Sequence, residues 1–103
     1  MKRLTANIQG RVQGVSFRYY TQITAQGLGL RGWVRNDHDG SVTVVAEGAE
    51  AELKQLLEFL RRGSPAAKVH IVKFDWKEAT YEFCRFEVRT WDWREGRSKE
   101  LRL

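Results

Sequence analysis

The segment Gly10-Arg11-Val12-Gln13-Gly14-Val15-Ser16-Phe17-Arg18 joins a strand pattern to a helix pattern through two glycines. Glycines let the backbone curl so that successive N–H groups turn inward, and a helix N-terminus adds a partial positive charge. Arg18 would close this cup with a guanidinium fork that matches phosphate oxygens. The segment therefore indicates a phosphate site, against the alternative of an ordinary loop with a surface arginine. Ser16 stands at the N-cap position, where we expect a structural rather than a nucleophilic hydroxyl.

A second candidate residue, Asn36, ends the segment Gly32-Trp33-Val34-Arg35-Asn36, shortly before Asp39-Gly40. Its amide suits two roles. It can cap the turn locally, as asparagines in turns usually do. It can also hold a water molecule, because an amide offers both a donor and an acceptor. The residue pattern alone leaves both roles open.

The distribution of charge favours an anionic partner. The 103-residue chain has 18 Lys and Arg against 13 Asp and Glu, a net charge of +5. Residues 1–36 contain six basic residues and no acidic one, so all of the net positive charge arises there. This asymmetry predicts a phosphate-bearing small molecule, a nucleic acid or an anionic surface as partner.

Periodicity and turn signals predict the elements that must position these residues. Alternation and turn residues predict strands over residues 4–8, 31–36, 41–47, 69–74 and 83–88. A first helix is expected over residues 17–26, because Gly27 and Gly29 close it. Asp39-Gly40 between the second and third strands is a strong hairpin signal.

The second helix has the clearest pattern in the chain. Apolar residues at helical spacing on one face are Ala49, Leu53, Leu56, Leu57 and Leu60. Acidic residues fall in its first turn and basic residues in its last, where each suits the helix dipole. Gly63 is a ready C-cap. A helix ending before Gly63 is predicted.

This order of elements predicts an α+β two-layer sandwich of ferredoxin-like βαββαβ topology. We expect an antiparallel sheet with both helices on one face and a short extra C-terminal strand. The length suits one core and one domain. The same architecture hosts many unrelated functions, so the fold class does not name an activity.

Two motifs carry a specific resemblance. The string Gly10 to Arg18 resembles the first signature of the acylphosphatase family, and Gly32 to Asn36 with the following Asp39-Gly40-Ser41-Val42 resembles the second. The motifs occur in the family's order and at its separation. The resemblance extends over about residues 4 to 90, so it covers nearly the whole chain.

The resemblance implies a small metal-independent hydrolase that cleaves acyl phosphates to a carboxylate and inorganic phosphate. It implies that Arg18 binds the substrate phosphate and that Asn36 orients the attacking water. The implied phosphate-binding loop, with its N–H groups, consists of Arg11, Val12, Gln13, Gly14, Val15, Ser16 and Phe17.

The chain continues past the point where family members typically stop. We therefore divide it into an acylphosphatase-like domain, residues 1–90, and a C-terminal extension, residues 91–103. Trp91 and Trp93 would extend the last strand or cover an apolar edge, and the polar stretch 94–100 is an equally good candidate for a frayed terminus.

Cofactor and metal sites are not expected. Residues 27–32 match the Gly-x-Gly-x-x-Gly motif of dinucleotide-binding proteins. That motif must follow a strand and begin a helix, whereas residues 27–32 follow a predicted helix and begin a predicted strand. The two histidines, His38 and His70, and the lone Cys84 do not have metal-ligand spacing.

Two other functions are compatible with parts of the sequence. An RNA-binding module would stack bases on exposed aromatic residues, and the candidates are Phe74, Trp76, Trp91 and Trp93. The aromatic RNP1 motif of such modules is absent from the sequence. A non-enzymatic phosphate-binding domain would have the same loop and Arg18 but would not hydrolyse its ligand. We expect a small acyl phosphate as partner, no nucleic acid, no membrane and a monomer. The absence of a signal-peptide pattern and the single cysteine predict a cytoplasmic protein.

Overall fold

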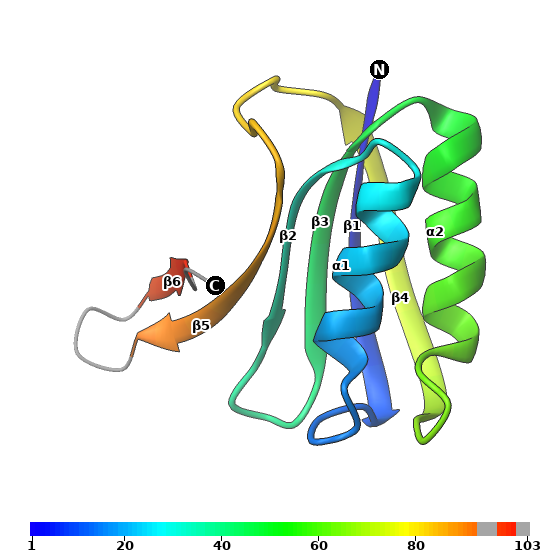
Figure 1. Cartoon of the computed structure of the whole chain (residues 1–103), viewed down its shortest axis with the longest axis vertical. Helices are drawn as coiled ribbons and strands as arrows, with labels where there is room; N and C mark the ends of the chain where they lie inside the picture. The colour runs from blue at the N-terminus through cyan, green and yellow to red at the C-terminus, as the bar shows by residue number, and fades with distance from the viewer. Residues whose placement is uncertain (93–96, 101–103) are drawn as a thin grey trace.

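In the computed structural model, which describes residues 1–92 and 97–100, two helices cover one face of a mixed sheet (Figure 1). The strands are β1 Lys2–Arg11, β2 Arg31–Asn36, β3 Val42–Gly48, β4 Lys68–Glu78, β5 Phe86–Asp92 and β6 Arg97–Glu100. The helices are α1 Phe17–Gly27 and α2 Glu50–Arg62. The strand order among the described residues is β4-β1-β3-β2-β5-β6. The predicted ferredoxin-like α+β architecture is confirmed.

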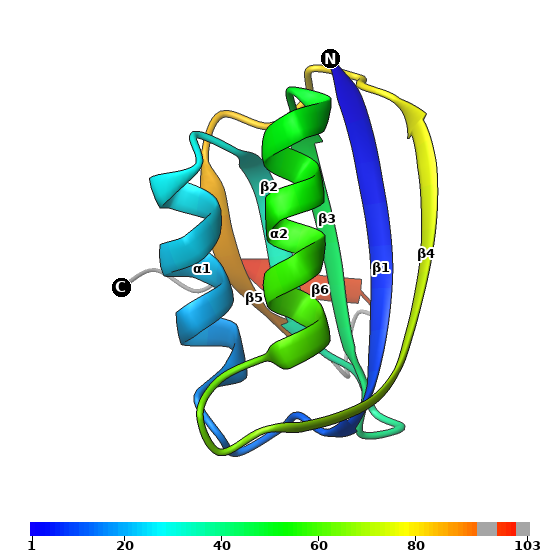
Figure 2. The same cartoon turned by 90° about the vertical axis from the view of Figure 1, so that its right-hand side faces the viewer.

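The core lies between the sheet and the two helices, which pack side by side on the same face (Figure 2). Alternation along β1 directs Leu4, Ala6 and Ile8 toward the helices, where all three are buried. The helices bury one face each. These buried residues are Phe17, Thr21 and Ala25 in α1 and Leu53, Leu56, Leu57 and Leu60 in α2.

The ends of α2 follow the predicted signals. Glu50 and Glu52 lie in its first turn, and Gly63 is its C-cap at a φ of 75°. Ala49, which the pattern placed on the buried face, is instead the exposed N-cap residue before the helix. In the described part of the chain, neither α1 nor α2 has the length and apolar character needed to cross a membrane.

The expectation of a fully antiparallel sheet is wrong at one pair of strands. β5 pairs with β2 in parallel, with Gly32 opposite Phe86 and Val34 opposite Val88. The reason is the route of the chain. β4 ends at the end of the sheet where β2 begins, and residues 79–85 cross along that end to the other edge, so β5 enters beside β2 in the same direction (Figure 1).

A buried carboxylate holds this crossing segment in place. Glu47 on β3 accepts hydrogen bonds from the backbone N–H groups of Thr80 at 2.8 Å and Tyr81 at 2.9 Å. The Arg3 guanidinium on β1 donates to the same carboxylate at 2.7 Å. The Thr80 hydroxyl also donates to it, so four donors from two parts of the chain, β1 and residues 80–81, share one buried carboxylate.

The C-terminal part contains more strand than predicted. β5 covers 86–92 rather than 83–88, and β6 pairs with it antiparallel from Arg89 opposite Glu100 to Asp92 opposite Arg97. Trp91 lies within β5 and so extends it, whereas Trp93 and residues 94–96 lie outside the described residues. Of the two alternatives for the end of the chain, residues 97–100 follow the strand and not the frayed terminus, and the proposed domain boundary after residue 90 lies within β5.

Candidate active site

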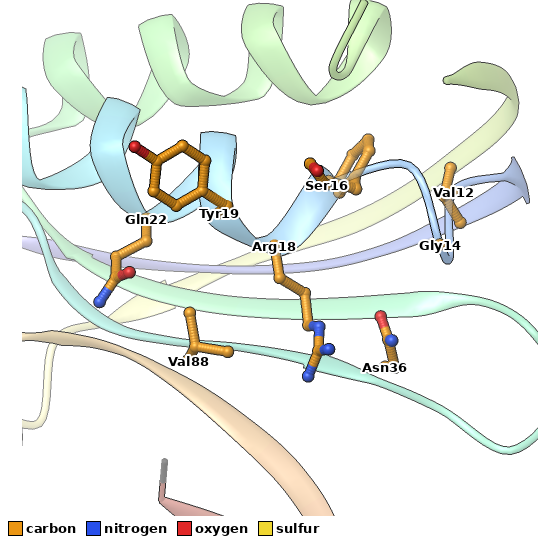
Figure 3. Close-up of a pocket in the computed structure, with 9 residues that line it drawn as sticks. Val12, Gly14, Ser16, Arg18, Tyr19, Gln22, Asn36 and Val88 are labelled. Atoms are coloured by element: carbon orange, nitrogen blue, oxygen red, sulfur yellow. The ribbon is translucent and has the colours of Figure 1, made fainter. Parts of the chain in front are cut away.

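A pocket of about 230 Å³ opens where the loop after β1 meets α1 and the neighbouring strands (Figure 3). The loop contributes Val12, Gly14 and Ser16. Asn36 from the end of β2 and Val88 from β5 line its other side. The remaining lining residues, Phe17, Arg18, Tyr19 and Gln22, come from the first two turns of α1. The loop and the helix start that the sequence indicated therefore do border one cavity.

The loop backbone takes up left-handed conformations at Gly14, with a φ of 72°, and at Ser16, with φ 59° and ψ 25°. A non-glycine residue pays a steric cost there, and such strain is typical of functional loops. Alternating right- and left-handed residues form the concave backbone that binds anions. Ser16 is the N-cap residue as expected, but its side chain makes no capping hydrogen bond. The left-handed backbone replaces the extended conformation that a serine cap uses.

Contacts on two sides fix this loop. The Ser64 hydroxyl donates to the Val15 carbonyl at 2.7 Å, which joins the loop to the segment after α2. The Gln13 side chain donates from Nε2 to the carbonyl oxygens of Asp37 at 2.7 Å and Ser41 at 2.9 Å, which joins it to the hairpin turn. The loop is therefore shaped before any ligand binds.

Arg18 lies in the first turn of α1, and its guanidinium group points to the same part of the pocket as the Asn36 amide (Figure 3). Its one hydrogen bond to the described protein is a long contact, 3.4 Å, from Nη1 to the Arg89 carbonyl. It forms no ion pair with any described residue. Burial lowers the pKa of this guanidinium, yet an arginine stays charged at physiological pH. The pocket thus contains a partly desolvated cation that no carboxylate neutralises.

Asn36 has a buried side-chain oxygen, Oδ1, that finds no hydrogen-bond donor among the described residues. The hairpin turn is held by other groups: the Asp37 N–H donates to the Ser41 carbonyl at 2.8 Å, and Asp39 Oδ1 accepts from the Ser41 N–H at 3.0 Å. Asn36 Oδ1 is therefore not a cap of this turn. A buried acceptor without a donor is costly, so its retention calls for a ligand that supplies one.

The structure separates the predicted loop residues into two groups. Val12, Gly14, Ser16 and Phe17 line the pocket together with Arg18 and Asn36. Arg11, Gln13 and Val15 do not line it: Arg11 is exposed at the end of β1, the Gln13 amide is bonded to the turn, and Val15 packs against the core.

Three further lining residues, Tyr19, Gln22 and Val88, were not proposed from the sequence. Gln22 follows Arg18 by four positions, so helical spacing places both on one face. Val88 had no local signal, because only the parallel pairing of β5 with β2 brings it to the pocket.

No three His, Cys, Asp or Glu side chains within residues 1–92 and 97–100 gather at distances that would hold a metal ion. His38, His70 and Cys84 are each exposed, and they lie on different elements. The dinucleotide-like residues 27–32 connect α1 to β2, in the helix-to-strand context expected from the sequence.

A family model described as acylphosphatase matches residues 4–88. The chain belongs to the acylphosphatase family. Among curated acylphosphatases, it is 47% identical to that of Salinibacter ruber, over 85% of this chain and 93% of the relative. It is 48% identical to that of Acaryochloris marina, over 82% of this chain and 90% of the relative.

A solved acylphosphatase from Bacillus subtilis superimposes with a TM-score of 0.83 at 38% identity, over 85% of this chain and 98% of that one. Likeness in sequence and in fold thus extends over nearly the whole of these relatives. The protein is an acylphosphatase enzyme, and acyl phosphates are its class of substrate.

Proposed function

We propose that this acylphosphatase works without a metal ion, by holding the substrate phosphate in the loop and on Arg18 and by placing a water molecule with Asn36. One observation carries the proposal: an uncompensated arginine and an unpartnered buried amide oxygen line one pocket beside a left-handed loop. Each feature is unfavourable in the free protein. A phosphate with its attacking water satisfies both.

The phosphate would lie against the backbone N–H groups of the loop Arg11–Phe17, at the positive end of α1. The Arg18 fork would bind two of its oxygens. Both groups stabilise the negative charge that spreads over the phosphoryl oxygens in the transition state. Because the loop is already anchored through Gln13 and Ser64, little reorganisation accompanies binding.

Asn36 would orient the nucleophile. Its Oδ1 accepts a hydrogen bond from the water, and its Nδ2 donates to a phosphoryl oxygen. The water oxygen attacks phosphorus, the bond from phosphorus to the acyl oxygen breaks, and its electron pair leaves with the carboxylate. The proton of the water passes to an oxygen of the phosphate. A carboxylate is a stable leaving group at neutral pH, so no general acid is required.

The sequence also predicted a monomeric, cytoplasmic enzyme whose substrate is a small acyl phosphate and which does not act on nucleic acid. These points stay predictions. The RNA-binding alternative would use Phe74 and Trp76 on β4. That strand forms one edge of the sheet, and β1, β3 and β2 separate it from the strand that carries Val88.

The test is the hydrolysis of benzoyl phosphate by Asn36→Ala and Asn36→Asp. Both variants should fold and bind inorganic phosphate, because Arg18 and the loop are unchanged. Their kcat should fall about a hundredfold or more, because the lost interaction acts in the transition state. Asparagine fits where aspartate does not, since a carboxylate lacks the donor and repels the anionic substrate.

A folded Asn36→Ala protein with near-normal kcat would remove Asn36 from the mechanism. The same assay with excess EDTA should leave the wild-type rate unchanged, and a strong loss would contradict a metal-independent reaction.

A further inference from the structure

The pocket is larger than the phosphate that Arg18 and the loop would hold. Its volume is about 230 Å³, which is about eight times the ~30 Å³ share of one water molecule in the liquid, whereas a phosphate group has only five heavy atoms. Tyr19, Gln22 and Val88 lie on the side of Arg18 away from Gly14 and Asn36 (Figure 3). The remaining space is therefore on the side of these three residues.

The chemistry of the reaction assigns this space to the acyl group. In phosphoryl transfer, the attacking and leaving oxygens lie roughly in line on opposite sides of phosphorus. If Asn36 holds the attacking water, the acyl oxygen must leave on the side of Arg18 that faces Gln22 and Val88. The acyl group is bonded to that oxygen, so it comes to rest against the same side chains.

Among the residues that the structure describes, the lining of this side carries no charge. Val88 is 8% exposed and offers an apolar wall. Tyr19 contacts the Tyr20 ring edge-on and is still 57% exposed, so part of its ring is accessible to a bound group, and Gln22 is a neutral amide. Arg18 is the one charged residue among the nine that line the pocket, and the phosphate engages it. A second carboxylate on the acyl group would lose water without gaining a partner, whereas an apolar group gains from leaving water.

We propose that Tyr19, Gln22 and Val88 form an acyl-group subsite that selects uncharged, apolar acyl groups over acyl groups that bear a second carboxylate. The inference rests on the proposed function, because it takes the positions of the phosphate and of the water from it. The three residues determine specificity and take no part in bond breaking.

The first test compares kcat/KM for benzoyl phosphate and acetyl phosphate in wild type and in Tyr19→Ala. The variant should lose about threefold to tenfold more on benzoyl phosphate than on acetyl phosphate, because only the larger group reaches the ring. Ile23→Ala is the matched control, since Ile23 is 47% exposed on the same helix and does not line the pocket. Equal losses on both substrates, or the same ratio as Ile23→Ala, would overturn the subsite.

The second test supplies the missing charge. In Gln22→Lys, kcat/KM for succinyl phosphate relative to acetyl phosphate should rise about twofold to fivefold, the range expected of a solvent-accessible ion pair. An unchanged ratio in a folded variant would place the acyl group elsewhere. Acetyl phosphate turnover that is insensitive to Asn36→Ala would instead overturn the proposed function, so the two failures are distinguishable.

Discussion

Arg18 and Asn36 both line the pocket, and among the described residues each lacks a different partner there. The guanidinium lacks an anion, and Asn36 Oδ1 lacks a donor. An anion alone would leave the amide oxygen unsatisfied, and water alone would leave the arginine uncompensated. A phosphate with a water beside it satisfies both, which is the ground state of the proposed reaction.

At Arg18 the shape of the cation matters as well as its charge. Arg18→Lys retains the positive charge and loses the planar fork, so two parallel hydrogen bonds to phosphate become one. We expect kcat/KM for benzoyl phosphate to fall about a hundredfold. The inhibition constant of inorganic phosphate should rise as well, unlike in the Asn36 variants.

Steady-state kinetics with phosphate as inhibitor measure both effects. Arg31→Lys serves as the control, because Arg31 is exposed at the start of β2 and does not line the pocket. Retention of most of the activity in Arg18→Lys would show that a point charge is enough, and would remove bidentate binding from the mechanism.

Among the structural elements, the loop before α1 and the β2–β3 turn must keep fixed positions relative to each other. The loop provides the proposed phosphate site, and Asn36 ends the strand that leads into the turn. Gln13 connects the two through its bonds to Asp37 and Ser41. We therefore interpret the Gln13 side chain as a positioning group that does not itself bind phosphate.

Gln13→Ala should reduce kcat about tenfold to a hundredfold, because small displacements of a placed water are costly to the reaction. Loss of two hydrogen bonds should also lower the free energy of unfolding by about 1 to 2 kcal/mol. Gln9→Ala is a matched control: Gln9 donates a side-chain hydrogen bond to Asn7 at 3.1 Å, whereas the bonds to the Asp37 and Ser41 carbonyl oxygens come from Gln13.

Thermal denaturation and kcat measured on both glutamine variants separate stability from positioning. If Gln13→Ala and Gln9→Ala lose stability while both keep kcat, Gln13 has a structural role only.

For the whole molecule, the critical connection is the one that carries the chain from β4 across to β5, since β5 supplies Val88 to the pocket. Glu47 anchors that connection from inside the sheet. Burial alone raises the pKa of this carboxyl. The hydrogen bonds from Thr80, Arg3 and Tyr81 outweigh that effect, so the pKa in the folded protein lies below its ordinary value.

A lowered pKa in the folded state means that the stabilisation from Glu47 is complete above the ordinary glutamate pKa, about 4.3. It is lost as the pH falls through the lower pKa of the folded protein. Glu47→Gln should therefore lower the free energy of unfolding at pH 7, by about 3 kcal/mol for a buried ion pair that loses one charge. The difference from wild type should shrink as the pH falls below about 4.

Denaturant titrations at pH 7 and pH 3 measure this difference. Glu82→Gln, which removes the more exposed acidic partner of Arg3, should have a much smaller effect at pH 7. A Glu47→Gln difference that is as large at pH 3 as at pH 7 would contradict the role of the ionised carboxylate.

Features that depend on neighbours along the chain were predictable from the amino-acid sequence. The leucines of α2 and its Gly63 cap, and the Asp39-Gly40 hairpin, follow from spacing and turn chemistry within a few residues. The glycine-containing loop before Arg18 was recognisable for the same reason. The order of elements predicted the fold class and two motifs at the family's spacing predicted the family, and both predictions are confirmed.

Features that depend on residues far apart in the chain became visible only in the folded protein. The parallel pairing of β5 with β2, the presence of β6 and the arrival of Val88 at the pocket all depend on the path of the crossing segment. Gly32 shows the same dependence, since a Cβ there would lie 1.9 Å from the Val45 carbonyl oxygen of the neighbouring strand. Sequence periodicity reports which face of an element is buried, but it carries no information about which distant backbone lies against that face.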